Sequence, residues 1–290
     1  MSVLSRLSLC ALLLSPSLLL AQAKATPLPQ IPKFVEGYVV TFEIKAIAPE
    51  IKSSSKTAPE AQAIMGQLRQ QSQLVSKVCL TKDLSRQEIQ STDFVLPAGT
   101  LVMHGSGDKF YAIADPKAKT YMVMDSEALL GALEGGAGIV NTQYDAKVQH
   151  TGEKKTIAGL ECRKSIVTVS YVSTMPFENS TVMVQQKNDI EIWHTPQLVS
   201  SAAMDHFFFK FQRDKTGTVR KMLAQEIGFP MEVRFVVTQG APGAKKAGES
   251  QAGSFEMRVS DVKVEKQIPS ELFQIPPAGF RQIEKNPYFK

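Results

Sequence analysis

The sequence predicts a mainly β (α+β) fold, in which about ten or eleven antiparallel strands form a curved sheet and two or three helices cover one of its faces. Three observations support this prediction. Apolar and polar residues alternate with a period of two along many segments, residues typical of tight turns separate these segments, and signals for helices are few.

The first strand is predicted at residues 38–46. Its period of two gives one apolar face and one mixed face, as in a half-buried antiparallel strand. The apolar face consists of Tyr38, Val40, Phe42, Ile44 and Ala46, and the mixed face of Val39, Thr41, Glu43 and Lys45.

An amphipathic helix is predicted next, at residues 59–76. Thr57 and Glu60 have the spacing of a capping box, which begins many helices. The apolar residues that fall near one helical face are Ala61, Ile64, Met65, Leu68 and Val75. We therefore expect a helical insertion over about residues 49–90.

Three short strands at residues 100–105, 109–114 and 120–124 are predicted to form a meander. The residues between them are typical of turns: Gly105-Ser106-Gly107-Asp108 and Asp115-Pro116-Lys117. Further strands are predicted at residues 142–150, 161–173, 180–185, 190–194, 219–227 and 231–238.

Two shorter helices are also predicted. One follows Ser126 and ends at Gly135-Gly136, and the other has Thr195 as its N-cap and Pro196 at its first position. The second of these carries a stripe of Leu198, Ala202, His206 and Phe209. Such a stripe either packs against the sheet or gates a ligand.

The last strand is predicted to contain a β-bulge at Ser260-Asp261. The apolar residues change phase there, because Phe255, Met257 and Val259 fall on one side and Val262 and Val264 on the other. An extra residue would return both sets to the inner face. Residues 239–253, rich in Gly, Ala and Lys, are predicted to form a hairpin loop.

The N-terminal residues 1–23 have the pattern of a cleavable signal peptide. Arg6 precedes an apolar run that ends in Ala21-Gln22-Ala23. A membrane anchor is the alternative, but the run contains Pro16 and is shorter than a spanning helix needs. After cleavage we expect a linker at 24–33, one domain at 34–283 and a tail at 284–290, with no transmembrane anchor.

Charge and composition limit the classes of partner. The net charge is +5, and the basic residues are scattered among acidic ones rather than clustered, which argues against nucleic-acid binding. Loose association with anionic envelope polymers or lipid headgroups would explain the basic balance, and so would an ordinary solvated surface.

Cys79 and Cys162 remain after removal of the signal peptide. In an oxidising compartment an even pair is typical of a disulfide, and two separate buried thiols are the alternative.

Several motifs resemble a bacterial family of domains of unknown function, designated DUF4412. In order, they are the strand at residues 34–44, Thr156-Ile157-Ala158-Gly159-Leu160-Glu161-Cys162, Glu191-Ile192-Trp193-His194-Thr195-Pro196, Gly228-Phe229-Pro230 and Ile268-Pro269-Ser270-Glu271-Leu272-Phe273-Gln274-Ile275-Pro276. The resemblance covers roughly residues 34–283. It implies an envelope location and an unclosed half-barrel akin to the periplasmic lipoprotein carriers (LolA/LolB-like), but it implies no catalytic residues.

The closing motif is predicted to cover the edge of the sheet. Pro269 and Pro276-Pro277 stop strand pairing. The apolar anchors are Leu272, Phe273, Ile275 and Phe280. Docking of a partner on these side chains is the alternative.

The sequence contains no constellation of residues that specifies a reaction, so we expect no enzyme and no cofactor. The histidines His104, His150, His194 and His206 lack the short spacing of zinc sites. One hypothesis is a structural or protein-interaction role in the cell envelope, with a filled core and an envelope protein as partner. The other is a carrier or binding module for a lipid or other apolar ligand on the concave face, lined by Tyr38, Phe42, Val102 and Met122.

Overall fold

The structure is a computed structural model that describes residues 33–47, 73–92, 96–105, 110–125, 140–177, 180–208, 211, 214, 216–240, 250–274 and 278–284. Several predictions lie wholly or mostly outside these residues: the signal peptide at 1–23, the linker at 24–33, the helical segment at 59–72, the helix after Ser126, the hairpin loop at 239–253 and the tail at 284–290.

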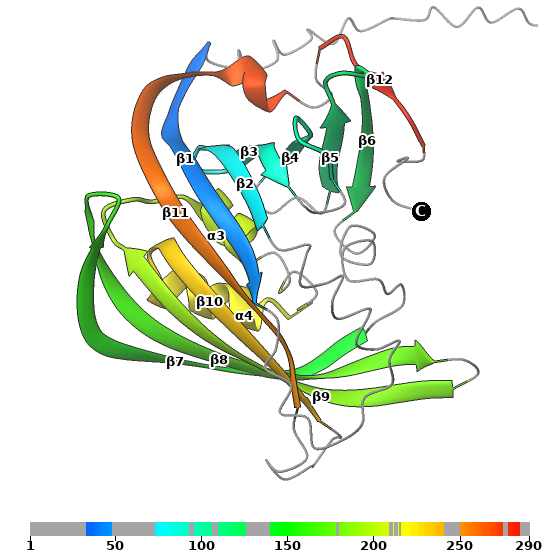
Figure 1. The fold of residues 1–290 in the computed structure, drawn as a ribbon, viewed down its shortest axis with the longest axis vertical. Coiled ribbons are helices and arrows are strands. Elements are labelled where there is room, and N and C mark those ends of the chain that lie inside the picture. Colours follow the sequence, from blue (N-terminus) through cyan, green and yellow to red (C-terminus); the bar gives the residue numbers. More distant parts are fainter. Residues whose placement is uncertain are drawn as a thin grey trace, which may run out of the picture. The chain divides into compact units, whose positions relative to one another are not determined.

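The described chain forms one sheet and two α-helices (Figure 1). The strands are β1 (Phe34–Ile47), β2 (Gln73–Leu80), β3 (Leu84–Thr92), β4 (Leu101–Gly105), β5 (Phe110–Asp115), β6 (Thr120–Asp125), β7 (Val140–Ile157), β8 (Leu160–Phe177), β9 (Ser180–Thr195), β10 (Phe229–Gly240), β11 (Ser250–Pro269) and β12 (Arg281–Gln282). The helices are α3 (Ser201–Phe207), α4 (Thr218–Glu226) and the short 3-10 helix η3 (Ser270–Phe273).

The sheet has twelve strands in the order β12-β6-β5-β4-β3-β2-β1-β11-β10-β9-β8-β7. Every neighbouring pair is antiparallel except β12 with β6. Since β12 and β7 lie at opposite ends of this order, the sheet is not closed. The prediction of a mainly β fold built on an unclosed sheet is therefore confirmed.

β11 contains the predicted bulge. Thr41 of β1 pairs with Asp261 and Phe42 pairs with Val259, so Ser260 is the extra residue. On the two sides of Ser260, Val259 is buried and Val262 packs against the core, as the change of phase in the apolar residues predicted. Val264 differs, because 62% of it is exposed.

The predicted helix at 59–76 is wrong over residues 73–76, and the predicted insertion at 49–90 is not helical over 73–90. Both segments belong to β2 and β3, which pair with each other and, through β2, with β1. In β2 the buried side chains alternate: Leu74, Ser76, Val78 and Leu80. This period of two fits a strand that has neighbours on both sides.

The predicted strand at 219–227 is also wrong, because these residues form most of α4. Asp214 stabilises the start of this helix by accepting hydrogen bonds from the backbone N–H of Thr216 (3.0 Å) and of Val219 (2.8 Å). The buried side chains are Val219 and Leu223, four residues apart, as on one face of a helix.

The helix predicted to begin at Thr195 begins later, at Ser201. Thr195 is the last residue of β9, and Ser200 is the N-cap, whose hydroxyl accepts from the N–H of Ala203 (3.2 Å). The strands predicted at 180–185 and 190–194 are one continuous strand, β9. Of the helices in the described part of the chain, none is long and apolar enough to cross a membrane.

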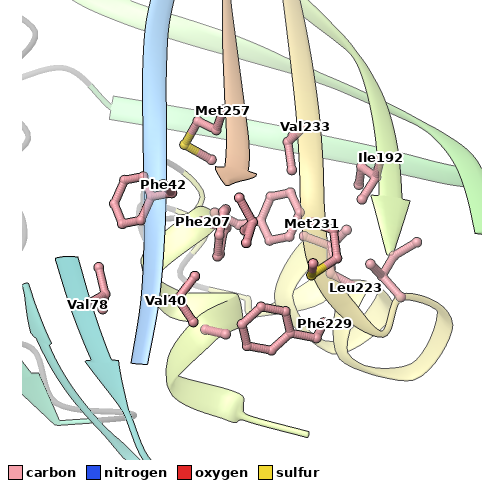
Figure 2. Packing of buried hydrophobic residues seen from close by; sticks show 14 of the residues in the cluster. Val40, Phe42, Val78, Ile192, Phe207, Leu223, Phe229, Met231, Val233 and Met257 are labelled. Atoms are coloured by element: carbon pink, nitrogen blue, oxygen red, sulfur yellow. The ribbon is translucent and has the colours of Figure 1, made fainter. Parts of the chain in front are cut away.

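The main core lies between one face of the sheet and the two helices (Figure 2). Phe42 of β1 meets two rings of α3, those of His206 (centroids 5.0 Å apart) and Phe207 (5.9 Å). The other labelled members come from β1, β2, β9, β10, β11 and α4: Val40, Val78, Ile192, Phe229, Met231, Val233, Met257 and Leu223. The helices therefore fill this face of the sheet with packed side chains.

Both faces of the meander β4–β6 carry buried side chains, because a second, smaller cluster lies on its other side. This cluster consists of Leu101, Met103, Ala112, Ala114 and Tyr121, with Phe280 of the C-terminal segment packed against it. β12 pairs with β6, and the N–H of Ile283 donates to the carbonyl of Tyr121 (2.8 Å). The C-terminal segment therefore covers the β6 edge of the sheet through β12, whereas the closing motif itself ends β11 and forms η3, and its residues 275–277 lie outside the described residues.

Candidate functional site

The four residues expected to face an apolar ligand lie together, but in the packed core. Phe42 and Met122 are buried, and Tyr38 and Val102 are half-buried against the same cluster. The Tyr38 hydroxyl accepts from the N–H of Val199 (3.2 Å). None of the four lines the three hollows described below.

The expected disulfide between Cys79 and Cys162 is wrong, because both are free thiols in the structure. Cys79 is on β2 and Cys162 on β8, with β1, β11, β10 and β9 between them. Five steps of about 4.8 Å place them about 24 Å apart along the sheet, whereas a disulfide needs Cα atoms within about 7 Å. Burial raises the pKa of both thiols.

A chain of hydrogen-bonded side chains links α4 to the last three strands of the sheet. The N–H of Gly228 donates to Nδ1 of His194 (3.0 Å), and Nε2 of His194 lies 2.9 Å from Oγ of Ser165. Oγ of Ser165 lies 2.9 Å from Nδ1 of His150, whose Nε2 lies 3.1 Å from Oε2 of Glu226. We call these five residues the histidine chain.

The direction of the hydrogen bonds in the histidine chain follows from its first donor. Because the Gly228 N–H can only donate, Nδ1 of His194 must accept, and neutral His194 then carries its proton on Nε2 and donates to Ser165. The Ser165 hydroxyl is left to donate to His150, whose Nε2–H donates to Glu226. Each donor in the histidine chain is therefore matched with an acceptor.

His194 is kept neutral by its surroundings. It is buried, and burial is the main reason why its pKa is lowered to about 4; the nearby His150 and Arg163 lower it further. Ser165 is fully buried as well, so its hydroxyl is not accessible as a nucleophile.

Close backbone packing places Gly228 at the start of the histidine chain. A Cβ on residue 228 would lie 2.4 Å from the carbonyl oxygen of Thr195, so only glycine lets the backbone N–H approach His194. His150 and Ser165 face each other across β7 and β8. Their pairing depends on an irregularity in β7 between His150 and Lys154.

An open hollow of about 830 Å³ lies beside the histidine chain. Its lining includes His150, Lys154, Arg163, Lys164, His194 and Glu226, and we call it the Arg163 hollow. Lys154 pairs with Glu161 (3.2 Å), and Lys164 pairs with Glu153 (3.3 Å) and Glu191 (3.4 Å). Among the described residues, no carboxylate pairs with Arg163.

No family model matches this chain, and no curated protein matches it. The resemblance to DUF4412 therefore stays a prediction. Two of its quoted motifs nevertheless meet in the structure, because His194 belongs to one and Gly228 to another, and a hydrogen bond joins them.

Two other hollows are lined by described residues. One, of about 570 Å³, lies where Leu101 and Met103 face Leu272 and Phe280 of the C-terminal segment. The other, of about 350 Å³, lies between α3 and α4. No cluster of His, Cys, Asp or Glu side chains in the described part of the chain is arranged to hold a metal ion.

Sequence reasoning missed the histidine chain. From the sequence, the four histidines were considered only as zinc ligands, and no pattern connected His150 with Ser165. The turn at Ala158-Gly159 predicts a hairpin in which β7 pairs with β8, but it does not predict that His150 is the residue opposite Ser165.

Proposed function

We propose that this chain is a cell-envelope protein with a structural or protein-interaction role, and that its core is filled by its own side chains. The N-terminal signal pattern and the resemblance to an envelope family support the location. The observation that carries the role is the packing of α3 against the sheet at Phe42.

A carrier of apolar ligands needs a cavity of several hundred cubic ångströms on the face that holds the ligand. On the face that carries Phe42, the positions expected to line such a cavity instead pack against α3 and the neighbouring strands. Phe42 is 1% exposed, and Phe229 meets both Tyr38 (centroids 5.9 Å apart) and Phe207 (6.2 Å). This packing favours a stable body that presents its surface to partners.

Native mass spectrometry of the mature protein, purified gently from its own cell envelope, tests the proposal. We expect the bare mass of the processed chain, and a cross-linked envelope protein when a photo-reactive residue replaces an exposed surface residue such as Val182. A stoichiometric lipid adduct would contradict the filled core, and recovery of unprocessed chain from the cytoplasm would contradict the location.

A carrier for a lipid or another apolar ligand is the second candidate, and one observation favours it. The hollow of about 570 Å³ near the C-terminal segment has Leu101, Met103 and Phe280 in its lining. It lies on the opposite face of β4 from Val102. A lipid adduct that is lost in Met103→Gln, but not in Val102→Thr, would assign the ligand to this hollow.

A further inference from the structure

We propose that the Arg163 hollow binds a phosphate group, held between Arg163 of β8 and Lys154 of β7. This site is independent of the proposed envelope role. It rests on the strand register, on the ion pairs around the hollow and on the histidine chain beside it.

The strand register places two cations opposite each other. Lys154 and Arg163 are direct partners across β7 and β8. Directly opposed side chains on one face have Cβ atoms about 5 Å apart, and like charges at such positions destabilise a sheet. An anion between the two cations would convert this repulsion into attraction.

The carboxylates nearby neutralise only one of the two cations. Glu161 pairs with Lys154 (3.2 Å), and Glu226 is engaged by His150. Arg163 has no carboxylate partner among the described residues. A guanidinium group with five donors and no acceptor is well suited to bind two phosphate oxygens at once.

Glu226, the carboxylate in the lining of the hollow, is on the side of His150, and Glu161 lies beside Lys154 outside this lining. Glu226 is the last residue of α4, where the helix dipole is also negative. Lys154 and Arg163 lie farther along β7 and β8, toward the turn at Ala158-Gly159. An anion would therefore bind at the end of the hollow that is closer to this turn.

The size of the hollow is informative about the ligand. At about 830 Å³ it is far larger than one phosphate ion and falls in the range of sites for small organic molecules. The phosphate group has two sources that share this chemistry: free inorganic phosphate, and the headgroup of a phospholipid whose remainder occupies the rest of the hollow.

The first experiment measures thermal unfolding and titration calorimetry of the full mature chain with inorganic phosphate, against chloride at equal ionic strength. We expect phosphate to raise the melting temperature and chloride not to do so. Arg163→Gln and Lys154→Gln should each weaken phosphate binding about tenfold or more, the scale of one charge-assisted hydrogen bond. Arg163→Lys should weaken it less.

The matched control is Lys147→Gln. Lys147 is also on β7, its side chain is 78% exposed, and it pairs with Asp145 (3.7 Å) away from the hollow. It should bind phosphate as the wild-type chain does. Equal effects of phosphate and chloride on the wild-type chain would overturn the proposal, and so would an equal loss in Lys147→Gln and Arg163→Gln.

Flotation with vesicles separates the two sources. If phosphatidic acid vesicles in a phosphatidylcholine background bind the chain, and inorganic phosphate or Arg163→Gln abolishes this binding, the ligand is a headgroup. If calorimetry detects inorganic phosphate and the vesicles do not bind, the ligand is a soluble phosphate compound. Vesicle binding that survives Arg163→Gln would contradict the assigned site.

Discussion

The backbone of Gly228 packs so closely on Thr195 that a Cβ at residue 228 would lie 2.4 Å from the Thr195 carbonyl oxygen. This contact brings the end of α4 to the end of β9 and directs the Gly228 N–H at His194. Replacing a hydrogen of Gly228 by a methyl group would therefore disturb both the backbone packing and the histidine chain.

Gly228→Ala should lower the free energy of unfolding by about 1–3 kcal/mol, the usual cost of forcing an extra group into a packed region. Urea unfolding followed by the fluorescence of Trp193, the only tryptophan, measures this change. Gly152→Asn is the control, because Gly152 has open space around it and asparagine tolerates its positive φ of 79°. A Gly228→Ala protein as stable as the wild type would contradict the close packing.

Acid should destabilise the fold between about pH 6.5 and pH 4. The pKa of His194 and that of His206 are each lowered to about 4, mainly by burial. In the unfolded chain these histidines bind a proton near pH 6.5, before the folded chain does, so the free energy of unfolding decreases as the pH falls. For His194 the full loss is about 3 kcal/mol, reached below about pH 4.

The test is a series of urea unfolding curves from pH 7.5 to pH 4, with His206→Phe as the comparison. Phenylalanine fits beside Phe42 and does not titrate, so this variant should lose less stability over the same range. If the stability of the wild type and of His206→Phe depended equally on pH, protonation of His206 would not destabilise the folded protein, which would contradict the prediction.

The thiols should remain reduced and unreactive in the folded protein. Cys162 is fully buried, and burial raises the pKa of both Cys79 and Cys162, so little thiolate is present at neutral pH. In a chain that lacks residues 1–23, and so Cys10, we expect two thiols to react with a thiol reagent after unfolding, and a reductant to leave the melting temperature unchanged. A mass 2 Da below that of the reduced chain would contradict the structure.

Phe280→Ala should lower the free energy of unfolding by about 1–3 kcal/mol. This is less than the same substitution costs at a fully buried phenylalanine, because Phe280 is only half-buried. Its ring covers the cluster that contains Leu101 and Tyr121. Unfolding curves compare this variant with Val264→Ala, which removes an exposed side chain from β11 and should have little effect. An equal effect of the two substitutions would mean that the C-terminal segment does not stabilise the meander.

The parts of the fold that were predicted correctly depend on local patterns. The alternation in β1 and the phase change at Ser260 are each visible within a few residues. The error at residues 73–76 arose where distant residues decide, because these residues continue an apolar helical pattern but their pairing with β1 makes them a strand. At residues 219–227 a local signal was missed, because Asp214 accepts a hydrogen bond from the N–H of Val219 near the start of α4.

The histidine chain could not be predicted from the sequence, because it depends on the register of two strands. Near the turn at Ala158-Gly159, regular pairing places Lys154 opposite Arg163. Continued without a break, this register would place Gly152, not His150, opposite Ser165. The irregularity between His150 and Lys154 shifts the pairing, and no local pattern in the sequence marks it.

The position of β11 between β1 and β10 has a consequence for the order of folding. β1 is the first described strand, yet one of its two neighbours, β11, is the last long one, and the two pair along nearly their whole length, from Phe34 with Pro269 to Ile47 with Ser254. Contacts between such distant segments slow folding, because a long loop must close before they form. The strands β1 and β10 cannot join through β11 until residues 254–269 have been synthesised, so a chain still short of these residues would lack the centre of the sheet.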